Sequence, residues 1–379
     1  MADEKTFDIA IIGGGLAGLC LAIQSAGKGY STILFEKEKY PFHKVCGEYI
    51  SLESWDFLSQ QGVPLQLWNL PIIKKLNATN VSGKEYHFDL DLGGFGISRY
   101  KLDDFLYQLA IQKGVVVKTQ TKVLNAVLKG EVFELETIEA NYVSRLVAGC
   151  FGKRSNLDVK FNRPFILQKK GKLNNYIGVK YHVNYPTEKD TIALHNFKNG
   201  YCGISAIEDG KSCVCYLTTA HNLQKAGNSI PQLQQNILGA NPHLLKIFKD
   251  ATVLYSQPLT ISQISFSNKS QVEENILMLG DAAGMITPLC GNGMSMAMHG
   301  SKIAFECMDL YLKNKVTRQQ MEIAYKTKWQ EKFAKRLWVG RRVQELFGGN
   351  VTTSLFLQTM KLIPPIARQI IKATHGSPF

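Results

Sequence analysis

Residues 7–36 read FDIAIIGGGLAGLCLAIQSAGKGYSTILFE, and this stretch decides the fold of the chain. Its apolar beginning, Phe7 to Ile12, is short enough to be a buried parallel strand. Three glycines follow in the pattern G-x-G-x-x-G, and apolar residues at helical spacing then predict a helix over residues 16–26. A second apolar run over residues 32–35 predicts the next strand, so the stretch predicts a β-α-β unit.

Each glycine of the motif answers a different steric demand. Gly13 permits the tight turn from strand to helix, and Gly15 lets the backbone approach a pyrophosphate. Gly18 lets the helix pack closely against the strand. A glycine-rich turn in an unrelated α/β protein is the alternative interpretation. The strand before the motif and the helix after it favour a dinucleotide site.

The start of the predicted helix and Glu36 complete this site. Leu16 and Ala17 open the helix, where unpaired N–H groups and the helix dipole attract phosphate. Glu36 lies 18 residues after Gly18, where a carboxylate can accept hydrogen bonds from ribose hydroxyls. By themselves these residues do not distinguish NAD from FAD.

The composition is that of a globular protein, with 45% hydrophobic and 20% charged residues. A chain of 379 residues can form one large domain or two closely packed ones. The eight cysteines contain no C-x-x-C pair and no zinc-finger spacing, so we expect reduced thiols, a cytoplasmic location and no metal site. The N-terminus lacks a basic segment and its apolar run is rich in glycine, so we expect neither a signal peptide nor a transmembrane helix.

The net charge of +13 is concentrated near the C-terminus. Residues 311–379 contain 13 Lys and Arg against Glu322, Glu331 and Glu345, a local charge of +10. Such a region can meet a membrane surface, an acidic partner or nucleic acid, and a solvated helical face is an equally good interpretation. We expect no nucleic acid partner and consider peripheral membrane contact through this region.

The middle and the end of the chain differ in pattern. Turn signals at Asn199-Gly200 and Asp209-Gly210 separate β-rich segments and predict an antiparallel sheet with a helical cover. Helical spacing beyond residue 318 predicts a helical C-terminal region. The β-rich segments of the whole chain after residue 75 are 76–97, 115–118, 123–128, 132–136, 142–148, 176–185, 191–197, 200–207, 212–219 and 252–266.

Two further places carry candidate site residues. Asp281 follows an apolar strand at residues 275–279, and open α/β sheets bind ligands at the carboxyl ends of their strands. Gly293 and Met294 open a helix whose N-terminus can face an anion or a carbonyl. In the loop over residues 37–51, Lys44 is a candidate anion contact. Spacing alone favours Cys46 as a buried residue over one that lies against a cofactor.

Three separated pieces of sequence together resemble the FAD-dependent p-hydroxybenzoate hydroxylase superfamily, which includes aromatic hydroxylases, flavin halogenases and geranylgeranyl reductases. They are residues 13–36, Ser98-Arg99 with Asp103, and Gly280-Asp281 with residues 291–294, and the resemblance spans residues 7 to about 310. It implies an FAD-dependent oxidoreductase. It also implies that Glu36 binds the adenosine ribose, Arg99 supports the pyrophosphate, the Val123 backbone contacts the adenine, Asp281 binds the ribityl chain, and Gly293 and Met294 face the pyrimidine edge of the flavin.

Residues 44–51, KVCGEYIS, are similar to the K-x-C-G-(E/G) stretch of geranylgeranyl reductases and their flavoprotein-dehydrogenase relatives. In those enzymes the stretch borders the isoalloxazine ring, which makes Cys46 a candidate catalytic residue. The W-x-W-x-I-P signature of flavin-dependent tryptophan halogenases is absent. Phe151 stands where the hydroxylases carry an Asp that serves FAD and NADPH binding, so the electron donor is either NAD(P)H or a reduced electron carrier.

These observations predict an α/β fold of the two-domain α+β type: a Rossmann-like FAD-binding domain, an inserted antiparallel β-sheet substrate domain and a helical C-terminal region. The predicted boundaries are 1–75, 98–155 and 268–312 for the FAD-binding domain, 76–97 and 156–267 for the substrate domain, and 313–379 for the C-terminal region.

The Cys46 loop and the missing Asp favour reduction of isoprenoid-type C=C bonds by hydride from reduced flavin. The aliphatic and aromatic residues of the β-rich middle region predict an apolar, lipid-like substrate for this reaction and for its alternative. The alternative is a monooxygenase that hydroxylates an aromatic or polyketide-like substrate with NAD(P)H and O₂. A non-catalytic FAD-binding module is a third hypothesis, and the intact pair of flavin motifs argues against it.

Overall fold

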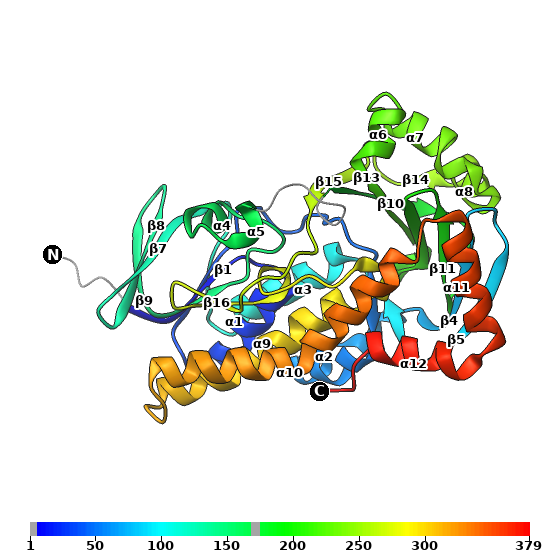
Figure 1. The fold of residues 1–379 in the computed structure, drawn as a ribbon. Coiled ribbons are helices and arrows are strands. Elements are labelled where there is room, and N and C mark those ends of the chain that lie inside the picture. Colours follow the sequence, from blue (N-terminus) through cyan, green and yellow to red (C-terminus); the bar gives the residue numbers. More distant parts are fainter. Residues whose placement is uncertain (1–5, 168–174) are drawn as a thin grey trace.

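The computed structural model describes residues 6–167 and 175–379 of the chain. Residues 1–5 and 168–174, which fall within the predicted FAD-binding and substrate domains, lie outside the described residues. Two β-sheets lie side by side, and the long helix α10 (Arg318–Glu345) extends from beneath the first sheet toward the second (Figure 1). The architecture is therefore the predicted α/β combination of two sheets and their helices.

The first sheet contains the predicted β-α-β unit. Strand β1 pairs in parallel with β2 and β9, so Ile11 stands beside Leu34 and Ala148. A parallel strand with neighbours on both sides is buried on both faces, which explains the unbroken apolar run at its centre. The strands are β1 (Thr6–Ile12), β2 (Thr32–Phe35), β6 (Val116–Lys118), β7 (Val123–Lys129), β8 (Val132–Thr137), β9 (Asn141–Gly149), β16 (Val272–Glu273) and β17 (Ile276–Met278), in the order β16-β17-β9-β1-β2-β6, with β8 attached to β9 and β7 to β8.

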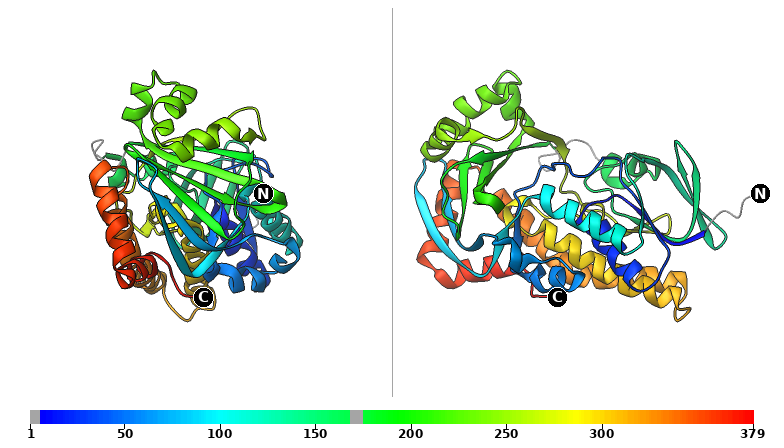
Figure 2. Two further views of the ribbon diagram at one scale, coloured as in Figure 1. Left: turned by 90° about the vertical axis from the view of Figure 1, so that its right-hand side faces the viewer. Right: turned by 180° about the vertical axis from the view of Figure 1, so that it is seen from behind.

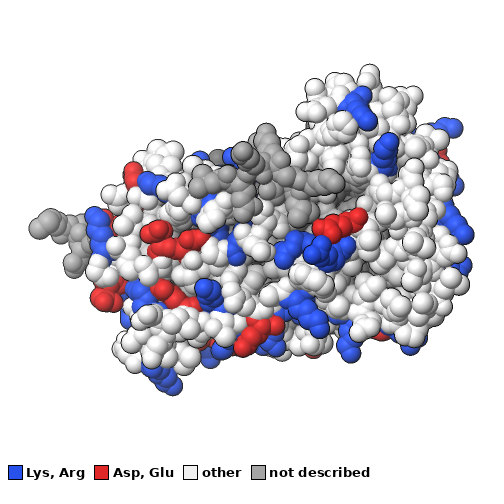
Figure 3. All heavy atoms as spheres, in the orientation of Figure 1, with Lys and Arg blue, Asp and Glu red and all other residues white. Residues whose placement is uncertain are grey.

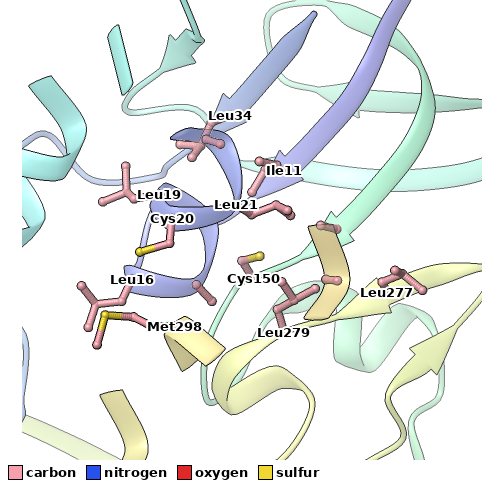
Figure 4. Close-up of a cluster of buried hydrophobic side chains, with 14 of the residues drawn as sticks. Ile11, Leu16, Leu19, Cys20, Leu21, Leu34, Cys150, Leu277, Leu279 and Met298 are labelled. Carbon is pink, nitrogen blue, oxygen red and sulfur yellow. The ribbon is translucent and has the colours of Figure 1, made fainter. Parts of the chain in front are cut away.

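Helix α1 (Leu16–Gly27) joins this sheet to helix α9 (Gly293–Leu312) through the main hydrophobic core. The apolar positions that predicted the helix, Leu16, Leu19, Cys20 and Ile23, are all buried. The core brings α1 together with residues from β1, β2, β9, β17 and α9. Figure 4 labels ten of its members: Ile11, Leu16, Leu19, Cys20, Leu21, Leu34, Cys150, Leu277, Leu279 and Met298.

Two sharp turns that the sequence predicts join neighbouring strands within the second sheet. Asn199 and Asp209 have φ of 58°, and Gly210 has φ of 71°, so each turn uses the left-handed conformation that these residue types tolerate. The strands are β3 (Tyr49–Ser51), β4 (Ile72–Thr79), β5 (Glu85–Gly96), β10 (Tyr176–Asn184), β11 (Thr191–Phe197), β12 (Gly200–Ala206), β13 (Ser212–Thr219), β14 (Thr252–Val253) and β15 (Leu259–Ile264), in the order β14-β10-β13-β12-β11-β4-β5-β3, with β15 beside β10.

The sheet is antiparallel, as predicted, except at one place, where β11 pairs in parallel with β4. A parallel pair needs a long crossover, and here the chain passes through the first sheet between the two strands. Residues 49–51 and 72–75, which the prediction grouped with the FAD-binding domain, hydrogen-bond into this second sheet. The division of the chain into domains stays a prediction.

Helices cover both sheets (Figures 1 and 2). Helix α3 begins at Arg99, because the Ser98 side chain accepts a hydrogen bond from the Lys101 backbone N–H and caps it. The remaining helices are α2 (Trp55–Gln61), α3 (Arg99–Gln112), α4 (Asn156–Lys160), α5 (Pro164–Leu167), α6 (Ala220–Lys225), α7 (Ile230–Asn236), α8 (Pro242–Asp250), α11 (Asn350–Leu362) and α12 (Pro364–Thr374). Within the described ranges no helix has the length and apolar character needed to cross a membrane.

The three motif glycines occupy different steric environments. Gly13 has φ of 109°, and a β-carbon there would overlap the Cys150 carbonyl oxygen. A β-carbon at Gly18 would overlap the carbonyl oxygen of Gly13, because α1 starts so close to the end of β1. At Gly15 the nearest protein atom would be 3.8 Å away, so the protein itself leaves room for a methyl group there.

We predict that Gly18→Ala lowers the free energy of unfolding by about 1–3 kcal/mol, because the added methyl forces α1 away from the strand. Gly15→Ala is the matched control, with an expected change within about 0.5 kcal/mol. Urea unfolding of the FAD-free proteins measures both values. Equal destabilisation by the two substitutions would contradict the steric distinction.

Candidate functional site

Two cations flank the N-terminus of α1. A β-carbon at Gly15 would lie 3.8 Å from Arg99 Nη2 and 3.9 Å from Lys44 Nζ. Lys44 comes from the loop after β2, whereas Arg99 is the first residue of α3, so the fold brings two separate segments to one helix start. Helix N–H groups together with two cations form a strong site for a diphosphate.

Asp103 holds the two cations in place. Its carboxylate oxygens lie 2.7 Å from Arg99 Nε, 2.7 Å from Arg99 Nη2 and 3.0 Å from Lys44 Nζ. Burial alone would raise the pKa of Asp103, but Arg99 and Lys44 lower it below its ordinary value. Asp103 thus stays ionised and cancels one of the two positive charges, which leaves a net positive charge beside Gly15.

Glu36 lies at the end of β2, as predicted, and is 7% exposed. Its carboxylate accepts hydrogen bonds from the Gly14 backbone N–H at 2.8 Å and from the Glu38 backbone N–H at 3.1 Å. The Tyr40 hydroxyl donates to the Gly14 carbonyl from the other side. These bonds fix the carboxylate next to the glycine turn, where a ribose that follows the diphosphate would lie.

The turn that carries Asp281, Gly280–Ala282, packs against α1. A β-carbon at Gly280 would lie 3.4 Å from the Ala17 β-carbon, so the predicted ribityl ligand stands beside the predicted phosphate site. Two basic residues that the sequence interpretation missed hold this turn. Lys269 Nζ donates to the Asp281 carbonyl at 2.7 Å, and the fully buried Arg163 donates through Nη2 to the Ala282 carbonyl at 3.0 Å. Burial lowers the pKa of Lys269 to about 8.

The loop with Cys46 meets the N-terminus of α9. Cys46 Sγ lies 3.6 Å from Met294 Sδ, although the two residues are 248 positions apart in the sequence. The α9 start has no side-chain cap, and Asn292 Oδ1 is buried without a hydrogen-bond partner among the described residues. The structure therefore brings the predicted catalytic residue and the predicted flavin-edge helix to the same place.

A buried carboxylate anchors this loop. Glu48 is fully buried and binds Lys180 Nζ and, at 2.5 Å, His182 Nε2, both from β10 of the second sheet. The same carboxylate accepts a hydrogen bond from the Arg99 backbone N–H at 2.8 Å. Lys180 also donates to the Lys44 carbonyl at 3.1 Å. One carboxylate thus links the Cys46 loop, the first turn of α3 and the second sheet.

No motif in the sequence indicates a role for Lys180 or His182. Their only signal in the sequence is their spacing of two residues along β10, which places both side chains on one face of an otherwise apolar strand. Burial alone would raise the pKa of Glu48, but Lys180 and His182 lower it. Glu48 therefore remains charged.

Glu48, His182 and Cys213 place possible ligand atoms within 4.8 Å of one another. Lys180 already brings a positive charge to Glu48, and burial raises the pKa of the Cys213 thiol well above its ordinary value. Both features disfavour a divalent cation, which needs deprotonated ligands. The expectation of no metal site stays a prediction.

Two other positions that the sequence singles out are Val123 and Phe151. Val123 begins β7, and its carbonyl accepts a hydrogen bond from Asn156 Nδ2 at 3.1 Å, so its contact with adenine stays a prediction. Phe151 follows β9, and its Cα would lie 2.9 Å from a β-carbon at Gly13. An apolar residue thus stands beside the glycine turn where the hydroxylases carry an Asp.

An apolar pocket lies beyond the α9 start, between the second sheet and helices α10 to α12. Tyr49 and Gly291 line it, and they flank Cys46 and Met294 in the sequence. No Asp, Glu, Lys or Arg occurs among its described lining residues. These are Tyr49, Leu76, Ala78, Phe88, Leu90, Ile192, Leu194, Leu289, Gly291, Val343, Phe347, Phe356, Leu357, Met360, Ile370, Ile371, Thr374 and His375.

The residues present fit FAD. The open space at Gly15 between two cations suits the pyrophosphate, Glu36 suits the ribose, and the uncapped start of α9 suits a polar ring edge. The chain matches the family described as FAD binding domain over residues 6–313, so it belongs to that family. It is an FAD-dependent oxidoreductase, and its resemblance to the p-hydroxybenzoate hydroxylase superfamily is confirmed.

Curated relatives span nearly the whole chain. Conditioned medium factor receptor 1 of Dictyostelium discoideum is 25% identical over 417 residues, which cover 100% of this chain and 76% of that protein. Digeranylgeranylglycerophospholipid reductase of Methanococcus vannielii is 24% identical over 356 residues, which cover 88% of this chain and 85% of that protein.

Solved structures share the fold. The flavin-dependent brominase Bmp2 has a TM-score of 0.79 and 17% identity, with 98% of this chain and 93% of that chain covered. A geranylgeranyl bacteriochlorophyll reductase-like protein of Thermoplasma acidophilum has a TM-score of 0.77 and 18% identity, with 98% and 92% covered. At these identities the likeness establishes the fold and leaves the reaction open.

We predict that Gly15→Ala weakens FAD binding by at least about tenfold, because its methyl group occupies the space between Arg99 and Lys44 that the pyrophosphate needs. Titration of the FAD-free protein by quenching of flavin fluorescence measures the dissociation constant. An unchanged constant would show that the pyrophosphate does not lie against Gly15.

We predict that Glu48→Gln lowers the free energy of unfolding at neutral pH by about 3 kcal/mol, because it leaves the Lys180 ammonium buried without its counter-ion. The pKa of Glu48 is lower in the folded state, so its contribution is complete above the ordinary value of 4.5 and is lost as the pH falls through the folded-state value. Denaturant unfolding of both proteins across this pH range should show their difference shrinking toward low pH. If the difference in unfolding free energy between the two proteins did not change with pH, the ionised state of Glu48 would not be the source of the stabilisation.

Proposed function

We propose that the protein reduces isoprenoid-type C=C bonds of an apolar, lipid-like substrate. The observation that carries the proposal is the contact of Cys46, in the K-V-C-G-E loop, with Met294, since each of the two lies three residues from a residue that lines the apolar pocket. That loop is similar to the loop of geranylgeranyl reductases, and the pocket supplies a binding site for a hydrocarbon beside it.

The pocket matches such a substrate in chemistry. Aliphatic and aromatic side chains form most of its wall. An isoprenoid chain offers only apolar surface along its length, so its burial there is favourable by the hydrophobic effect. The relative from Methanococcus vannielii, named as a reductase of a digeranylgeranyl phospholipid, supports this substrate class.

Bound FAD supplies hydride chemistry when it is reduced. The residues of the chain contribute by positioning the cofactor and the Cys46 loop. Lys44 and Arg99 hold the diphosphate end, and Glu48 fixes the Cys46 loop against the second sheet. The apolar wall keeps water from the reacting end of the pocket. The electron donor is either NAD(P)H or a reduced carrier, and Phe151 beside the glycine turn favours the carrier.

The test is anaerobic turnover of the purified FAD-loaded protein with dithionite as reductant and a geranylgeranyl lipid as substrate. We predict a product heavier by two hydrogens for each reduced bond, detected by mass spectrometry. A matched reaction with a fully saturated lipid should give no product. Absence of reduced product, together with NADPH- and substrate-dependent O₂ consumption with a phenolic compound, would support the monooxygenase alternative instead.

A further inference from the structure

Helix α11 has apolar residues on two opposite faces. At 100° per residue, Thr353, Leu357 and Met360 fall on one side of the helix, and all three are buried. Val351, Leu355 and Leu362 fall within about 40° of one another on the other side. These three are 75%, 64% and 71% exposed. A helix that is apolar on both faces has a second apolar environment besides its own core.

The exposed apolar set continues around the turn into α12. Ile363 is 44% exposed and Ile366 is 38% exposed, and Pro364 and Pro365 between them are also exposed. We call Val351, Leu355, Leu362, Ile363 and Ile366 the α11–α12 corner. The two prolines lie in the first turn of α12, which begins one residue after Ile363 caps the end of α11, so the connection between the two helices is short.

Charge on the two helices of the corner has one sign. Lys361, Arg368 and Lys372 are exposed on the same two helices, and residues 346–379 contain no Asp or Glu. In Figure 3 the end of the molecule where Figure 1 places α11 is mostly uncharged, with Lys and Arg along its border. An apolar centre with a basic border complements an anionic lipid surface, which offers acyl chains beneath negative headgroups.

The inner faces of the same helices line the apolar pocket. Leu357 and Met360 of α11 and Ile370 and Ile371 of α12 all contribute to its wall. If the α11–α12 corner rests on a lipid surface, only the layer formed by these two helices therefore separates the lipid from the pocket. This arrangement suits a substrate that resides in a membrane.

We propose that the α11–α12 corner docks the enzyme onto anionic phospholipid bilayers, from which the apolar substrate enters the pocket. The substrate route rests on the proposed function, whereas the docking itself rests on the exposure and charge of the corner. The partner is the anionic lipid surface, because neither a free phosphate nor an acidic peptide explains five exposed apolar residues.

Flotation of the FAD-loaded protein with vesicles tests the docking. The wild-type protein should float with phosphatidylcholine–phosphatidylglycerol vesicles and float less with pure phosphatidylcholine vesicles or at high salt. The double variant Leu355→Asp/Leu362→Asp should reduce partitioning at least about tenfold. The matched control is Ile138→Asp, because Ile138 is 81% exposed in the turn between β8 and β9 of the other sheet, and it should bind as the wild type does.

Flavin content and the thermal midpoint verify that each variant is folded. Equal partitioning of the double variant and the wild type would overturn the proposal. Absence of vesicle binding by the wild-type protein would also overturn the proposal. This includes the case in which gel filtration shows a dimer that the double variant abolishes. Turnover of a detergent-dispersed prenyl lipid is measured in a separate assay. Vesicle binding without turnover would therefore contradict the proposed function but not the proposed docking surface.

Discussion

The site depends on one buried carboxylate, that of Glu48. It binds Lys180 and His182 of the second sheet and accepts a hydrogen bond from the Arg99 backbone at the start of α3. Glu48 itself has φ of 55°, a left-handed conformation that costs a non-glycine residue about 1 kcal/mol or more. The ion pair and the hydrogen bonds hold the loop in that conformation, so Cys46 and Lys44 are placed by the same interaction that places Arg99.

This arrangement explains how two sheets make one site. The first sheet supplies the glycine turn, Glu36 and the Asp281 turn, which suit the nucleotide part of FAD. The second sheet supplies the wall of the apolar pocket, and the C-terminal helices close it. The Cys46 loop and the start of α9 meet at the border between these parts, where the reacting ring of a bound flavin is expected.

Much of the fold could be predicted from the sequence, because its signals are local. The apolar run of β1, the helical spacing of α1 and the Asn199-Gly200 turn each follow from residues close together in the chain. The parallel pairing of β11 with β4 could not be predicted, since it depends on a crossover through the other sheet.

The site was predictable only where a motif carries its chemistry in consecutive residues. Gly15, Glu36 and Asp281 are of this kind. Lys180 and His182 act on a carboxylate more than 130 residues away, so no local pattern shows their partner. Arg163 and Lys269 likewise hold the Asp281 turn from outside it. Their roles follow from buried charge, which the sequence alone does not locate.

We expect a single bound FAD to contact both the nucleotide segments and the Cys46–Met294 border. Hydrogen–deuterium exchange of the FAD-free and FAD-loaded protein tests this expectation directly. We predict that FAD protects residues 13–18, 43–48 and 291–296 together, and leaves the β7–β8 hairpin unchanged beyond its first residues. Protection confined to residues 13–36 would contradict it, because the flavin ring would then lie away from Cys46 and the apolar pocket.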